Sequence, residues 1–111
     1  MAPTTRNASL GRIGEQIAVR HLERAGLSVV ARNWRCADAA VRGELDIVAV
    51  DGATLVACEV KTRRRAAADD ALEAVTTRKQ QQLRRLAAAY AAQLPWRPAA
   101  LRIDVVGVWW P

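Results

Sequence analysis

Apolar and polar residues alternate with helical spacing in two segments of the chain. The first begins at Ser9, within SLGRIGEQIAVRHLERAG, and Gly26 is a candidate stop signal. The second runs from about Thr77 to Leu94, with Thr76 as a candidate N-cap. The apolar stripe predicted for the first helix consists of Leu10, Gly14, Ile17, Ala18, His21, Leu22 and Ala25, which makes His21 a packed residue.

Four other segments have the apolar, β-branched composition of strands. They are Leu27 to about Trp34, the two halves of Gly43 to Arg63 on either side of Asp51-Gly52, and Leu101 to Trp110. The element order is therefore α-β-β-β-α-β. The second helix connects the third strand to the fourth, so these two strands should be parallel. We predict an α/β fold with a mixed sheet flanked by helices.

The length of 111 residues suits one domain. Residues 1–8 are expected to be a flexible tail, and residues 9–111 a single domain.

The hairpin of residues 43–63 carries charged residues inside apolar strands. Two registers suit a turn at Asp51-Gly52: a two-residue loop pairs Val50 with Ala53, and a four-residue loop pairs Val50 with Leu55. Side chains alternate along a strand, so both registers give one charged face and one apolar face. The charged face comprises Glu44, Asp46, Glu59 and Lys61, and the inward face comprises Leu45, Ile47, Cys58 and Val60.

In the second register Asp46 lies opposite Glu59, with Cβ atoms about 4.5–5.5 Å apart. Two such carboxylates repel by about 3 kcal/mol at an effective dielectric constant of about 20. Lys61 neutralises one of the two negative charges. The other must be relieved by a raised pKa, by solvent or by a divalent cation. Oxygen ligands of this kind suit Mg²⁺ or Mn²⁺. The simpler alternative is an exposed sheet face with a cross-strand salt bridge.

Charge and composition indicate the class of partner. The net charge is +6, and all basic residues except Lys61 and Lys79 are arginines, which match phosphate oxygens. A codon bias toward arginine is the alternative explanation. No apolar run is long enough to span a membrane, and Cys36 and Cys58 fit no zinc spacing, so we expect a cytoplasmic protein without a membrane partner.

The spacing of the acids resembles a nuclease motif. Asp46, twelve residues and then Glu59-Val60-Lys61 resemble the D-x(n)-(D/E)-x-K motif of the PD-(D/E)xK nuclease superfamily. The ordered blocks GRIGEQIAVRHL, ARNWR, GELDIVA, CEVKTR and AVTTRKQQQLRR resemble the YraN-like family of small bacterial candidate endonucleases, over about residues 9–109. That family is similar in core to archaeal Holliday-junction resolvases.

The resemblance implies a restriction-endonuclease-like core and metal-dependent hydrolysis of DNA, with branched or flapped DNA as candidate substrates. Asp46 and Glu59 would bind Mg²⁺ or Mn²⁺, together with the main-chain carbonyl of Val60. Lys61 would position or polarise the attacking water, and Glu15 would reach the same site from the first helix.

A set of basic and polar residues near these acids is predicted to contact nucleic acid, although such residues are often simply solvated. A non-catalytic nucleic-acid-binding accessory protein of DNA processing is the alternative function. The oligomeric state stays open, with a homodimer as one option. The predicted contact residues are Arg32, Arg35, Arg63, Arg64, Arg65, Lys79 and Gln80.

Overall fold

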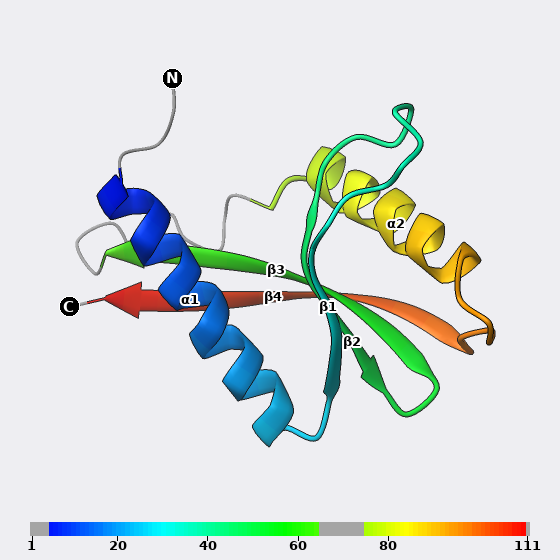
Figure 1. Ribbon diagram of the computed structural model, residues 1–111, viewed down its shortest axis with the longest axis horizontal. Coiled ribbons are helices and arrows are strands. Elements are labelled where there is room, and N and C mark those ends of the chain that lie inside the picture. The colour runs from blue at the N-terminus through cyan, green and yellow to red at the C-terminus, as the bar shows by residue number, and fades with distance from the viewer. Residues whose placement is uncertain (1–4, 65–74, 111) are drawn as a thin grey trace.

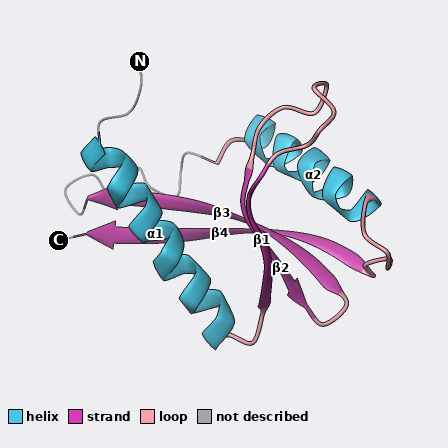
Figure 2. Ribbon diagram, viewed as in Figure 1, coloured by secondary structure: helices cyan, strands magenta, loops and turns pink. Residues whose placement is uncertain are grey.

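The computed structural model describes residues 5–64 and 75–110, and it confirms the predicted α/β fold and order of elements. Figure 1 shows the arrangement, and Figure 2 shows α1 crossing in front of β3 and β4. Neither described helix is long and apolar enough to cross a membrane. The elements are α1 (Thr5–Arg24), β1 (Ser28–Trp34), β2 (Leu45–Asp51), β3 (Thr54–Arg64), α2 (Thr77–Ala92) and β4 (Ala100–Trp110).

The four strands form one mixed sheet in the order β1-β2-β3-β4. β1 and β2 are antiparallel, as are β2 and β3, while β3 and β4 are parallel. β3 and β4 are joined by the long α2 crossover, which brings the chain back to the same end of the sheet and allows the two strands to run parallel. A tight turn would have made them antiparallel. Thr76 caps α2 as predicted, since its hydroxyl accepts a hydrogen bond of 3.1 Å from the main-chain N–H of Lys79.

The β2–β3 hairpin adopts the second of the two registers, with Val50 opposite Leu55. Asp51 also pairs with Thr54, so the tight loop is Gly52-Ala53, one residue beyond the predicted turn. Gly52 has φ of 60°, which suits the first position of a primed turn. Asp51 stays in the strand, where Arg102 of β4 contacts its carboxylate at 3.2 Å.

Each face of the sheet has its own hydrophobic cluster. The cluster under α1 joins Ala18, Leu22 and Leu27 to Ile47, Ala49, Val56 and Cys58 of the sheet. The cluster under α2 joins Leu83, Leu86, Ala87 and Tyr90 to Leu45, Val48, Leu55 and Ala57. The fold therefore has three layers, with the sheet between two helices.

The prediction that Leu45 shares a face with Ile47 is wrong. Leu45 lies in the cluster under α2, whereas Ile47 lies under α1. Leu45 pairs with Trp34 of β1, which follows Asn33 at φ of 52°. A left-handed residue interrupts strand alternation, so the Trp34–Leu45 pair turns toward α2. There Trp34 meets Tyr90 edge to face, with ring centroids 5.2 Å apart.

Two predictions for α1 also need correction. The helix begins at Thr5, four residues before the predicted start at Ser9. His21 is exposed, not packed. The buried stripe is narrower than predicted, and it leaves Ile17 41% exposed.

Close approach of α1 to β3 explains the narrow stripe. Gly14 is buried, and a Cβ atom at this position would overlap the side chain of Thr62. Both branches of Thr62 crowd the position, so rotation of Thr62 about χ1 does not relieve the overlap. Glycine therefore sets the distance between α1 and the sheet.

We expect Gly14→Ala to destabilise the protein by about 1–3 kcal/mol, because overpacking outweighs the gain in helix propensity. Gly11→Ala is the matched control, since a Cβ atom there has no neighbour within 4 Å. That variant should be stabilised by about 1 kcal/mol. Urea unfolding of both variants checks the prediction, and equal stabilisation of the two would contradict it.

Candidate functional site

The candidate site lies where β3 continues beyond its pairing with β2. The ladder of paired residues between these strands ends at Ile47 and Cys58, so Asp46 and Glu59 are the first residues beyond it on the two strands. β3 then runs on to Arg64 beside β4. Here Oδ2 of Asp46 accepts a hydrogen bond of 2.8 Å from the main-chain N–H of Val60. A side chain thus replaces the backbone partner at the end of the ladder.

Asp46 has a strongly perturbed acidity. The pKa of its carboxyl is raised from 3.8 to about 6, mainly by burial and also by the charges of Glu59 and Glu44. The hydrogen bond from Val60 and the charge of Lys79 act in the opposite direction. Perturbation by burial and neighbouring charge is common in functional sites.

Glu59 is the buried charged residue at the centre of the site, with 7% of its surface exposed. Its Oε1 atom lies 3.6 Å from Nζ of Lys61 and 3.8 Å from Nζ of Lys79. Its Oε2 atom is buried and has no hydrogen-bond partner among the described residues. An unsatisfied buried acceptor costs about 1–3 kcal/mol, so this oxygen is available to a cation or a donor from outside the chain.

Glu15 lies on α1, close enough to Asp46 and Glu44 for their charges to act on its carboxyl. Burial raises the pKa of its carboxyl, and the charge of Asp46 is the next largest cause. Its Oε2 atom lies 3.7 Å from Nη2 of Arg32. With the amide of Asn33 oriented to donate, its nitrogen lies 3.2 Å from Glu15 and 3.0 Å from Oε1 of Glu44.

Asn33 was not among the predicted site residues, although it links two of the acids. An asparagine near the end of a predicted strand was the available signal, because asparagine tolerates the left-handed conformation found here. Glu44 lies just before β2 and forms an ion pair of 3.0 Å with Arg35. It therefore lies at the border of the site.

The predicted nucleic-acid contacts are dispersed. Arg32 and Arg35 pair with the acids Glu15 and Glu44. Arg63 donates a hydrogen bond of 2.9 Å to the main-chain oxygen of Thr62. Arg65 and the side chain of Arg64 lie outside the described part of the structure.

The two α2 residues predicted to contact nucleic acid point in different directions. Lys79 is half-buried against Glu59. Gln80 lines a hollow beside Leu101 and Ile103 of β4, and its amide donates to the main-chain oxygen of Val75 at 3.4 Å. Lys79 therefore belongs to the acidic site, and Gln80 does not.

The donor set fits a cation that needs few protein ligands. Within residues 5–64 and 75–110, no group of three or more His, Cys, Asp or Glu side chains is placed to hold a metal ion. Mg²⁺ is commonly bound through one or two carboxylates, with waters and substrate phosphates completing its shell. The high pKa of Asp46 and the unpartnered oxygen of Glu59 fit this mode of binding.

Comparison with known proteins identifies the family. The model of the uncharacterised protein family UPF0102 matches residues 14–108. The chain belongs to UPF0102. This agrees with the resemblance of its sequence blocks to the YraN-like family. UPF0102 proteins of Parafrankia sp. strain EAN1pec and Beutenbergia cavernae are 50% and 52% identical, each over 90% of this chain and 81% of the relative. One from Mycolicibacterium vanbaalenii is 48% identical over 97% of this chain and 86% of the relative.

Asp46 should make the stability of this UPF0102 chain depend on pH in metal-free buffer. Its native pKa of about 6 exceeds 3.8, so the native state binds the proton more tightly than the unfolded state. The contribution of protonated Asp46 to the free energy of unfolding is complete below about pH 4, and it is lost as the pH rises through about 6. Solvent screening of this half-buried group reduces the loss to about 1–2 kcal/mol.

Asp46→Asn should remove this loss, because the amide oxygen still accepts from Val60 and carries no charge. We expect the variant to be more stable than the parent by about 1–2 kcal/mol at pH 7.5 and similar to it at pH 4. Urea unfolding between these pH values checks this, with Glu23→Gln on the exposed side of α1 as the control. A parallel pH dependence in parent and Asp46→Asn would contradict the assignment.

Proposed function

We propose that this UPF0102 chain is a metal-dependent endonuclease that hydrolyses DNA phosphodiester bonds in the manner of the PD-(D/E)xK nucleases. The observation that carries the proposal is the buried Glu59, which is flanked by Lys61 and lies close enough to Asp46 for its charge to raise the pKa of that carboxyl. Both helices contribute to this one point, with Glu15 from α1 and Lys79 from α2. Acids and lysines so arranged suit hydrolysis of a phosphodiester better than a solvated sheet face, because Glu59 is buried.

Asp46 and Glu59 would hold Mg²⁺ or Mn²⁺, with the main-chain carbonyl of Val60 as a further ligand. When bound, such a cation lowers the pKa of a water molecule and offsets charge on the phosphate. A cation held there would supply positive charge beside Glu59, whose Oε2 atom has no partner among the described residues, and it would compete with the proton for Asp46.

The lysines act on the reacting groups. The ammonium of Lys61, held beside Glu59, donates to the attacking water or to a phosphate oxygen and offsets charge in the transition state. Lys79 supplies a second ammonium to the non-bridging oxygens. Glu15, whose pKa is raised, accepts a hydrogen bond from water on the α1 side of the site.

One observation favours a second candidate, a non-catalytic nucleic-acid-binding accessory protein. Lys61 and Lys79 both lie within 4 Å of Glu59, so two internal cations already compensate this carboxylate. This candidate requires salt-sensitive DNA binding that Asp46→Asn leaves unchanged, and no cleavage with any divalent cation.

Metal binding is measurable without catalysis. Mn²⁺ at about 100 times its dissociation constant should stabilise the parent protein by about 2.7 kcal/mol at pH 7.5. The stabilisation should shrink below pH 6, where protons compete for Asp46. Glu59→Gln should abolish it, whereas Asp38→Asn in the exposed loop should retain it. Thermal unfolding with and without Mn²⁺ gives the answer, and an undiminished effect in Glu59→Gln would exclude this site.

Cleavage tests the proposal directly. We expect cutting of a mixture of duplex, flapped and four-way DNA with Mg²⁺ or Mn²⁺, and none with EDTA. Lys61→Met should reduce the rate about 100–1,000-fold, the range found when one preorganised donor is removed. Asp46→Asn should reduce cutting below detection. Metal-dependent cutting that survives in Asp46→Asn would indicate a contaminant and remove the support for the site.

A further inference from the structure

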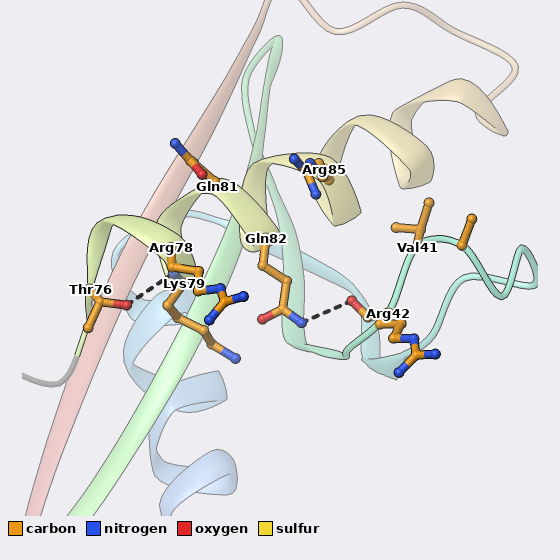
Figure 3. Close-up of a pocket in the computed structure, with 9 residues that line it drawn as sticks. Val41, Arg42, Thr76, Arg78, Lys79, Gln81, Gln82 and Arg85 are labelled. Atoms are coloured by element: carbon orange, nitrogen blue, oxygen red, sulfur yellow. Dashed lines mark hydrogen bonds between the residues drawn. The ribbon is translucent and has the colours of Figure 1, made fainter.

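A second charged feature lies on the α2 side of the acidic site. It is a cleft of about 600 Å³ between the start of α2 and the loop that precedes β2. Figure 3 shows this cleft, with α2 on one side and the segment of Val41 and Arg42 on the other. Four of the residues that line it are cationic and none is acidic; the cations are Arg42, Arg78, Lys79 and Arg85.

The two walls of the cleft are joined. The side-chain amide of Gln82 donates a hydrogen bond of 3.1 Å to the main-chain oxygen of Arg42 (Figure 3). Gly43 follows with φ of 105°, and a Cβ atom there would lie 2.5 Å from Nε2 of Gln82. Only glycine allows the loop to approach α2 this closely in that conformation. The hydrogen bond and the close approach at Gly43 therefore connect the two walls of the cleft.

Lys79 belongs to both the cleft and the acidic site. It lines the cleft, and its Nζ atom lies 3.8 Å from Oε1 of Glu59. The positive surface therefore begins at the carboxylates and extends along α2 to Arg85. Arg85 lies seven positions after Arg78, which is about 10.5 Å along the helix axis. At about 3.4 Å per nucleotide, this length corresponds to about three nucleotides of one strand.

We infer that this cleft binds the sugar-phosphate backbone of the DNA strand next to the phosphate that is cut. The inference rests on the proposed function, and it adds the path of the strand. Arginine forks and the N-terminal end of α2 both favour phosphate oxygens. The lining holds no aromatic side chain on which a base would stack. Recognition in the cleft is therefore by backbone charge and does not select a base sequence.

Binding measured without cleavage tests the inference. The double variant Arg78→Gln/Arg85→Gln is compared with Arg20→Gln/Arg84→Gln, which removes the same charge outside the cleft. Arg84 is the matched neighbour, because it lies on α2 beside Arg85 but lines the hollow at β4. Fluorescence anisotropy with labelled flapped DNA in EDTA gives the affinity as a function of salt.

The cleft variant should bind about tenfold more weakly at low salt, and its slope of log affinity against log salt should fall by about two. The loss should be the same for unrelated base sequences. The control variant should keep most of the affinity. Equal weakening of both variants would show a general effect of net charge and overturn the inference, as would a loss that depends on base sequence.

The cleft and the proposed activity can fail separately. Binding in EDTA that depends on Arg78 and Arg85, together with no cleavage by the parent protein, would retain the cleft and reject the endonuclease. Metal-dependent cleavage that Asp46→Asn abolishes, together with unchanged binding by the cleft variant, would retain the endonuclease and reject the cleft.

Discussion

The hydrogen bond between the main-chain N–H of Val60 and Oδ2 of Asp46 holds β2 against β3 where their ladder has ended. It gives the N–H group an acceptor that no backbone carbonyl of β2 supplies there. It also keeps Asp46 beside Glu59, in surroundings that raise its pKa to about 6. The strand end and the acidic site thus depend on the same contact. If the ladder had continued, a backbone carbonyl of β2 would have accepted the hydrogen bond from Val60, and the carboxylate of Asp46 would not have been needed as the acceptor.

The charges around this contact are balanced unevenly. Arg32 and Arg35 lie near the outer acids Glu15 and Glu44, and two lysines lie near one oxygen of Glu59. The other oxygen of Glu59 is buried and has no hydrogen-bond partner within residues 5–64 and 75–110. Buried unsatisfied groups destabilise a fold, and they persist mainly where a function requires them. The unevenness therefore supports a site prepared for a cation or a donor.

Local backbone geometry brings groups from both faces of the sheet to one place. Asn33 adopts a left-handed conformation, so Arg32 lies toward α1 while Trp34 packs against Tyr90 of α2. The same turn of β1 allows the amide of Asn33 to reach Glu15 and Glu44. Gly14 brings α1 close enough to β3 for its neighbour Glu15 to join the acids. The site thus receives side chains from both helices, although these helices cover opposite faces of the sheet.

Much of this protein is determined by local properties of its sequence. Helical and strand periodicity predicted the six elements and their order, because burial of one side of an element leaves a repeat in the chain. Alternation along β3 placed Glu59 and Lys61 together, and the spacing to Asp46 left only two registers that unite them.

The tertiary structure decided what depends on contacts between distant segments. The choice of register, the face of Leu45 beside the left-handed Asn33 and the exposure of His21 depend on how the elements pack against one another. The unpartnered oxygen of Glu59 and the basic cleft at α2 arise only where segments far apart in the sequence meet, and no local pattern records such a meeting.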